Sequence, residues 1–171
     1  MLLQFICKDL IMTREERVQY GKLTESAVIK SLVAYANDNN LPCTAISYDS
    51  HSMEDQQLKI DFSITDDNGT KHFNVKSVLP NNANTPNFTC PLSVVTDAYK
   101  LVDYIIFLEA YDPSQNMLPE YCYIVKRSDL CKLDEQNSDI MRKVTRHDGS
   151  FYLINKLFIK NTAPKIKMIY D

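Results

Sequence analysis

The chain reads KIDFSITDDNGTKHFNVK from residue 59 to residue 76. Polar and apolar residues alternate on both sides of the DDNG segment, a period of two that is typical of a half-buried β-hairpin. If Asn68 and Gly69 are the central residues of a type I′ turn, Asp61 lies opposite Lys76. Because strand side chains alternate, one face carries Asp61, Ser63, Asn74 and Lys76, and the other carries Ile60, Phe62, Ile64, Phe73 and Val75. Two interpretations remain open: a functional cluster, or the solvated face of a hairpin with a cross-strand ion pair between Asp61 and Lys76.

An upstream helix supplies a further carboxylate. Thr13 and Glu16 have the spacing of a capping box, and helical periodicity continues to about residue 37. At about 100° per residue, Glu25 lies in the middle of an apolar stripe that contains Val18, Gly21, Val28, Leu32 and Ala36. A carboxylate directed at a core is costly unless it is paired or binds a metal. Glu25 therefore pairs with a lysine, reaches water at the edge of the stripe, or points to the same site as Asp61 and Lys76.

The other segments predict one α/β or α+β domain built on a single mixed sheet flanked by helices. We expect strands at 43–48, 103–110 and 121–126, helices at 93–101 and within 129–143, a loop at 80–91, and a last strand or strand pair at 151–160. The chain has 171 residues, of which 44% are hydrophobic and 24% are charged, as in an ordinary globular domain. The predicted domain spans residues 1–171, with a core at about 13–126 and a basic extension at about 142–171.

Charge and cysteine content narrow the function classes. The formal net charge is −3, which argues against a broadly basic nucleic-acid binder, and the three glycines form no phosphate-binding loop motif. Residues 142–171 nevertheless hold seven Lys or Arg residues against two Asp residues. This segment is either an anion-facing surface or a solvated basic face. Five cysteines without a CxxC pair predict a reduced, cytoplasmic protein, and we expect no membrane span.

A helix carboxylate, an aspartate on one strand and a lysine on the next suit the hydrolysis of a phosphodiester assisted by a hard cation. Mg²⁺ prefers oxygen ligands and is commonly held by one or two carboxylates. The cation neutralises charge that develops on the phosphate, and a neighbouring lysine stabilises the same charge. The segment from Tyr48 to Asp55, which includes His51, precedes the Asp61 strand and is expected to line such a site.

The order Gly21-x-x-x-Glu25, Ile60-Asp61 and Phe73-Asn74-Val75-Lys76 resembles the PD-(D/E)xK nuclease superfamily. The resemblance implies the restriction-endonuclease-like fold, with an αβββαβ core. It also implies that Asp61 is the central ligand of Mg²⁺ or Mn²⁺, that Lys76 is the catalytic lysine, that Glu25 is an accessory acid and that the Val75 carbonyl is a further ligand. Asn74 stands where the family usually has Asp or Glu, which weakens the implied metal site, and Ile60 stands where the motif has Pro.

These residues predict a metal-dependent endonuclease that cleaves DNA. Such an enzyme would be of the kind found in restriction systems or mobile elements. The length of the chain is compatible with action as a homodimer. Candidate nucleic-acid contacts are Asn82, Asn84, Lys156, Lys160, Lys165 and Lys167. One alternative is a catalytically lapsed module of the same fold that binds nucleic acid or a protein partner. Another is an unrelated α/β binding domain in which the acid and lysine are merely structural.

Overall fold

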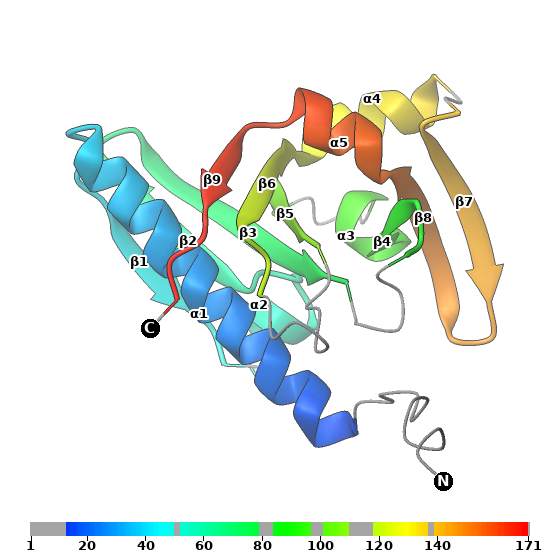
Figure 1. The fold of residues 1–171 in the computed structure, drawn as a ribbon, viewed down its shortest axis with the longest axis horizontal. Coiled ribbons are helices and arrows are strands. Elements are labelled where there is room, and N and C mark those ends of the chain that lie inside the picture. Colours follow the sequence, from blue (N-terminus) through cyan, green and yellow to red (C-terminus); the bar gives the residue numbers. More distant parts are fainter. Residues whose placement is uncertain are drawn as a thin grey trace, which may run out of the picture.

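A six-stranded mixed sheet forms the centre of the molecule (Figure 1). The computed structural model describes residues 13–49, 52–78, 84–96, 101–109, 118–136 and 139–170. The strand order is β1-β2-β3-β5-β6-β9, and only the β3–β5 pair is parallel. The strands are β1 (Thr44–Ser47), β2 (Phe62–Asp66), β3 (Gly69–Ser77), β5 (Tyr104–Leu108), β6 (Tyr121–Lys126) and β9 (Lys165–Lys167). The predicted mixed sheet flanked by helices is confirmed, but the prediction of a single sheet is wrong, because a second, three-stranded sheet is present.

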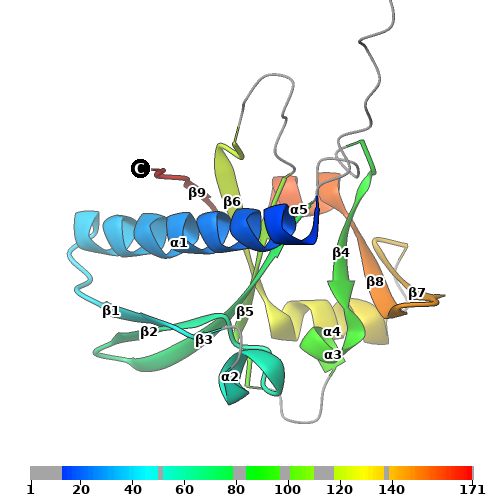
Figure 2. The same cartoon turned by 90° about the horizontal axis from the view of Figure 1, so that it is seen from below.

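The long helix α1 (Arg14–Asp38) covers one face of this sheet (Figure 2). The predicted capping box is present, because the Thr13 side chain accepts a hydrogen bond from the Glu16 N–H and the Glu16 carboxylate accepts one from the Thr13 N–H. Val28 and Leu32 pack with Phe62 and Phe73, whose rings stack across β2 and β3 with centroids 4.8 Å apart. Burial of this apolar face holds α1 on the sheet.

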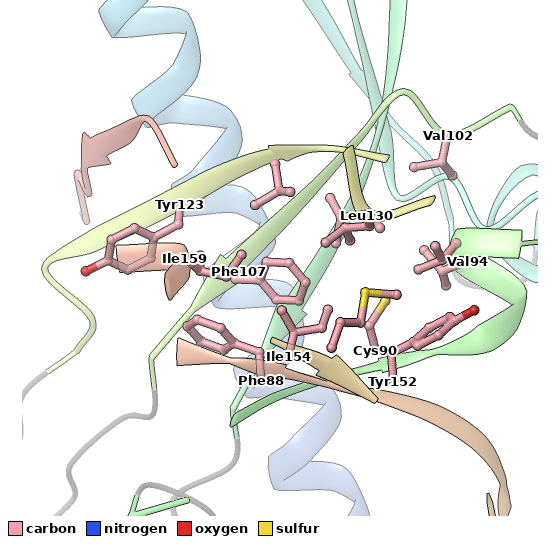
Figure 3. Packing of buried hydrophobic residues seen from close by; sticks show 14 of the residues in the cluster. Phe88, Cys90, Val94, Val102, Phe107, Tyr123, Leu130, Tyr152, Ile154 and Ile159 are labelled. Atoms are coloured by element: carbon pink, nitrogen blue, oxygen red, sulfur yellow. The ribbon is translucent and has the colours of Figure 1, made fainter. Parts of the chain in front are cut away.

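A second, three-stranded sheet covers part of the opposite face. It has the order β4-β8-β7, formed by β4 (Asn87–Pro91), β8 (Gly149–Asn155) and β7 (Met141–Arg146). Figure 3 shows Phe88 and Ile154 of this small sheet near Phe107 of the large sheet, while Tyr152 lies beside Cys90 in the same cluster. The rings of Phe88 and Phe107 stack with centroids 4.9 Å apart.

Four short helices complete the fold: α2 (Met53–Gln56), α3 (Leu92–Thr96), α4 (Arg127–Glu135) and α5 (Lys156–Thr162). Val94 and Val95 of α3, Leu130 of α4 and Ile159 of α5 join the buried cluster between the two sheets. The parallel connection from β3 to β5 therefore passes through β4 and α3, on the face of the large sheet opposite α1.

Two local predictions were wrong. The expected loop at 80–91 contains strand β4, because Phe88 and Cys90 alternate into the core and pair with β8. Of the one or two helices expected within 129–143, the structure has one, α4, and the strand β7 follows it. The last predicted strand, 151–160, ends at residue 155, where the Asn155 side chain caps α5 by accepting a hydrogen bond from the Phe158 N–H.

The β2–β3 hairpin is present, but its register differs from the prediction by two residues. Phe62 pairs with Phe73 and Asp66 pairs with Gly69, so Asp67 and Asn68 form the turn. The Asp66 carboxylate accepts a hydrogen bond from the Asn68 N–H at 2.7 Å, and only Gly69 adopts a left-handed φ, of 110°. A type I′ turn centred on Asn68 and Gly69 needs positive φ at both residues. Asn68 does not have it, so the predicted turn does not form and the register differs.

Of the described helices, none is long and apolar enough to cross a membrane. The four cysteines that the structure describes are all free.

Candidate functional site

Asp61 lies at a bend immediately before β2 and is held by three hydrogen bonds. Its N–H donates to the Phe73 carbonyl at 2.9 Å, and its own carbonyl accepts from the Tyr48 N–H at 2.9 Å. One carboxylate oxygen accepts from the Val75 N–H at 2.5 Å. The carboxylate is therefore fixed against the middle of β3.

The bend corrects one prediction about the hairpin. Ile60 packs in the cluster between the two sheets and not with Phe62 on the α1 face. Lys59 adopts a left-handed φ of 59°, and the Ile60 N–H donates to the Glu54 carbonyl, so the alternation of β2 begins only at Phe62.

Asn74 and Lys76 follow each other along the same face of β3. Asn74 is 2% exposed. Its Nδ2 donates to the Lys59 carbonyl at 2.8 Å, whereas its Oδ1 has no hydrogen-bond partner among the described residues. The register places Asn74 beside Asp61, where the sequence predicted Lys76. The two-residue shift keeps Ser63, Asn74 and Lys76 on one face, because side-chain direction repeats every two residues, whereas Asp61 lies at the bend before this alternation begins.

Glu25 reaches the site from the edge of the buried face of α1. Its position differs from the prediction: the buried face runs through Thr24, Val28 and Leu32, while Val18 is 50% exposed. Of the interpretations left open for Glu25, the structure supports a half-buried carboxylate at the edge, near Asp61. The pKa of the Glu25 carboxyl is raised from 4.5 to about 7, mainly by burial and also by the charges of Asp61 and Asp55, while Lys22 opposes the rise.

The Asp61 carboxyl shows the same crowding of acids. Its pKa is raised from 3.8 to about 6, mainly by burial, while Lys76 and the Val75 N–H oppose this change. Asp55 of α2 contributes to the rise through its charge and a side-chain hydrogen bond. Like charges that are close together and partly buried shift the pKa values of their groups, and such shifts are typical of functional sites. Asp61 and Asp55 thus act electrostatically on Glu25, and Lys76 and Asp55 act on Asp61.

Lys76 lies between this acid cluster and the small sheet. Its positive charge favours the ionised form of Asp61 and also lowers the pKa of Cys90 in β4, against the burial that raises the Cys90 pKa to about 12. The charge of Lys76 therefore acts both on Asp61, next to the large sheet, and on Cys90 of the small sheet.

A hollow of about 770 Å³ opens beside the acids, between α1 and the edge strand β1. Lys22 and Glu25 line it from α1, and Tyr48, Asp49 and Asp55 line it from the segment after β1. The predicted lining by the segment 48–55 holds for these three residues, whereas His51 lies outside the described residues. The hollow gives solvent and a ligand access to the Glu25 side of the cluster.

A chain of side-chain hydrogen bonds crosses β2 beside the site. The Tyr48 hydroxyl and the Ser63 hydroxyl are 3.1 Å apart, and the Ser63 hydroxyl is 2.7 Å from His72 Nδ1. Sequence alternation placed Ser63 on this face, but the contact with Tyr48 depends on the β1–β2 pairing, which no local pattern predicts.

The predicted nucleic-acid contacts differ in their surroundings. Lys156 is 9% exposed and lies over the Phe88 ring at 5.7 Å, and burial lowers its pKa. Lys160 forms an ion pair with Glu109 at 3.0 Å. Lys165 and Lys167 lie on the edge strand β9, where Lys165 is 4.6 Å from the centroid of the Tyr121 ring. Asn84 is exposed, and Asn82 lies outside the described residues.

Within the described part of the chain, no group of three or more His, Cys, Asp or Glu side chains is arranged to hold a metal ion. A cation at the site would depend on fewer carboxylates, together with amide, backbone or water oxygens. This combination is common for Mg²⁺, which retains part of its water shell.

The structure is similar to that of D212, a nuclease from a fusselovirus. The TM-score is 0.54 and the two sequences are 12% identical, over 86% of this chain and 87% of that chain. No protein-family model matches the sequence, and no sequence among the curated proteins matches it. The likeness shows a shared fold across most of both chains, and the fold thus resembles that of a viral nuclease.

Proposed function

We propose that the protein is a metal-dependent nuclease that hydrolyses phosphodiester bonds in DNA. One observation carries this proposal: two carboxylates, Glu25 from α1 and Asp61 before β2, interact electrostatically with each other, and Lys76 from β3 acts on the second. The similarity to a viral nuclease supports it at the level of the fold. The resemblance to the PD-(D/E)xK motif supplies the roles, since Asp61, Asn74 and Lys76 are the matching positions.

The residues fit a divalent cation. Asn74 Oδ1 is a buried acceptor without a hydrogen-bond partner among the described residues, and such an atom is costly unless something binds it. Glu25 and Asp61 both carry raised pKa values, so a nearby positive charge favours their ionised forms. We assign Asp61, Glu25 and Asn74 as residues that would hold Mg²⁺ or Mn²⁺, with the Val75 carbonyl as a further ligand. When bound, the cation supplies positive charge that offsets the charge developing on the phosphate.

The side chains of the protein have separate tasks in this proposal. The Val75 N–H holds the Asp61 carboxylate in one orientation. Lys76 donates hydrogen bonds to a phosphate oxygen and stabilises negative charge there, a contribution that preorganised donors supply in many enzymes. The Asn74 side chain is fixed by its bond to the Lys59 carbonyl, and its amide oxygen is the atom that would act as a ligand. A restriction or mobile-element role and action as a homodimer remain predictions from the sequence.

A second candidate is a lapsed module of the same fold that binds nucleic acid without cleaving it. The observation that favours it is Asn74, which contributes no negative charge where the related motif usually has an acid. A neutral ligand in place of a carboxylate weakens the hold on a divalent cation.

Cleavage of supercoiled plasmid in Mg²⁺ or Mn²⁺ tests the proposal. Asp61→Asn and Lys76→Ala should each lower the cleavage rate by about 100-fold or more, as loss of a charge-stabilising group does in other enzymes. Asp67→Asn in the hairpin turn and Lys71→Ala on β3, both exposed, are matched controls and should cleave like the unmodified protein.

Metal-dependent cleavage that persists in both Asp61→Asn and Lys76→Ala would contradict the site assignment. Tight binding of nucleic acid without cleavage of plasmid, linear DNA or RNA would favour the lapsed module.

A further inference from the structure

The small sheet has an outer face that points away from the large sheet. Tyr152 and Ile154 of β8 are fully buried on its inner face, so Phe151 and Leu153 between them lie on the outer one. Helices α3, α4 and α5 bring their buried residues to the inner face only. We define the small-sheet outer face by Thr89, Arg142, Val144, Arg146, Phe151 and Leu153, and Figure 1 shows the β7–β8 hairpin extending to the edge of the molecule.

The charge of this surface is of one sign. The strands β4, β7 and β8 contain no acidic residue, although the chain has 22. Lys143 points to the inner side, where it is 3.1 Å from the Asp134 carboxylate and 5.6 Å from the Tyr152 ring centroid. Arg142 and Arg146 lie on the outer face, and no carboxylate among the described residues pairs with them. The nearest acid in sequence is Asp148, in the turn of the hairpin.

An aromatic ring accompanies these cations. The guanidinium carbon of Arg146 is 5.8 Å from the centroid of the Phe151 ring, and Phe151 is only partly buried. The positive φ of Gly149, 138°, and its missing side chain leave the ring edge open, because a Cβ there would lie 3.7 Å from Phe151. A partly exposed ring beside Arg146, on a sheet face that also carries Arg142, has the chemistry of a platform for unpaired bases.

We propose that the small-sheet outer face binds single-stranded nucleic acid, with phosphates on Arg142 and Arg146 and a base stacked on Phe151. The choice of ligand rests on the proposed nuclease function. A single strand is favoured over a duplex because the faces of paired bases are hidden in their own stack. A surface without carboxylates is complementary to a polyanion along its whole length.

Fluorescence anisotropy with a labelled oligothymidine of about 20 nucleotides tests this, in EDTA so that cleavage does not interfere. The double variant Arg142→Gln/Arg146→Gln should flatten the slope of log K against log salt by about 1.4, since each lost phosphate contact removes about 0.7. Phe151→Leu keeps the partly buried apolar side chain and should weaken binding about fivefold or more, by removing the stacking.

Two matched controls are available elsewhere. Lys132→Gln removes an exposed cation from α4, and Tyr35→Leu removes an aromatic ring that is 54% exposed on α1. Both should bind the oligonucleotide like the unmodified protein. Phe151→Leu should leave the affinity for a duplex of the same length unchanged, and thermal melting checks that each variant is folded.

Unchanged oligonucleotide affinity in both outer-face variants overturns the proposal, whether or not the protein cleaves plasmid. An equal loss of duplex affinity in Phe151→Leu overturns the single-strand assignment. If the variants instead change the self-association of the protein measured by sedimentation, the face is an interface between copies of the chain and the proposal fails. Loss of oligonucleotide binding in the variants, in a protein that cleaves nothing, supports this surface and contradicts the nuclease function.

Discussion

The acid cluster and the small-sheet outer face carry charges of opposite sign. At the acid cluster, Asp61 and Asp55 raise the pKa of Glu25, and Asp55 also raises the pKa of Asp61. On the outer face, two arginines stand without a carboxylate partner among the described residues. A polyanion is repelled by the first region and attracted by the second. The difference suggests that one region supplies the chemistry and the other holds the substrate, and each of the following experiments tests this division.

The largest expected effect concerns the helix acid. Glu25→Gln keeps the shape of the side chain and removes its charge, so we expect plasmid cleavage to slow by about 100-fold if Glu25 helps to hold the cation. Glu15→Gln, at an exposed acid in the first turn of the same helix, should leave the rate unchanged. Equal rates for the two variants would remove Glu25 from the site.

The second expected effect concerns Asn74. Asn74→Asp replaces the Nδ2 donor with an oxygen that faces the Lys59 carbonyl, and it adds a third carboxylate beside Asp61. An unmet buried group costs about 1–3 kcal/mol. We therefore expect the melting temperature in EDTA at pH 8 to fall by roughly 2–8 °C for a chain of this size. Added Mn²⁺ should recover part of the loss, because a cation offsets the added charge, and Asn87→Asp on β4 controls for a mere change of charge. A stable Asn74→Asp variant that is indifferent to Mn²⁺ would argue against a cation site here.

The third expected effect is a dependence of stability on pH. The pKa of Glu25 is raised from 4.5 to about 7 and that of Asp61 from 3.8 to about 6, so the folded protein binds protons that the unfolded chain has released. Stability therefore falls as the pH rises through this window, from about 4 to about 7. Asp61→Asn removes one of these groups and should melt a few degrees higher than the unmodified protein at pH 8 in EDTA, roughly 2–6 °C.

This advantage should shrink as the pH is lowered toward about 4, where the unfolded chain also holds its protons. Melting curves recorded by circular dichroism across this range measure the difference. Arg146→Gln, on the small-sheet outer face, should show no such pH-dependent gain. A constant difference between Asp61→Asn and the unmodified protein at all pH values would contradict the crowding of acids.

The smallest expected effect concerns Asp148, the single acid in the turn of the β7–β8 hairpin. Asp148→Lys makes the hairpin uniformly basic and should tighten oligonucleotide binding by about two- to fourfold at low salt, with little change at high salt because exposed charges are screened. Asp129→Lys on α4 should not tighten it to the same extent. A similar gain for both variants would indicate attraction by net charge alone and not by the outer face.

Several features of the site followed from short-range patterns. Alternation placed Asn74 and Lys76 on one face of β3, and this remained correct although the register was wrong by two, whereas the predicted alternation fails at Ile60 and Asp61, before β2 begins. A register shift by an even number of residues leaves each side chain on the same face of the sheet. The error in the predicted turn therefore did not change the face on which these residues lie. The helix start at Thr13 also followed from local hydrogen bonding, because the capping box involves residues three apart.

Other features depend on contacts between distant residues. Strand β4 exists because Phe88 and Cys90 pair with Ile154 and Tyr152 of β8, more than 60 residues later in the chain. The local composition of residues 80–91, rich in Asn and Pro, indicates a loop. Burial of Phe88 against Phe107 overrides this preference, as tertiary packing often overrides local propensity.

The sequence by itself determined the hairpin, its two faces and the long capped helix, because these depend on side-chain alternation and on hydrogen bonds between near neighbours. Only the tertiary structure decided which face of α1 is buried, and it moved Glu25 from the middle of an apolar stripe to its edge beside Asp61 and Asp55. Only the tertiary structure also showed that β4, β7 and β8 form a second sheet with an acid-free outer face. Burial and electrostatic crowding arise between elements that are far apart in the chain, and no local pattern encodes them.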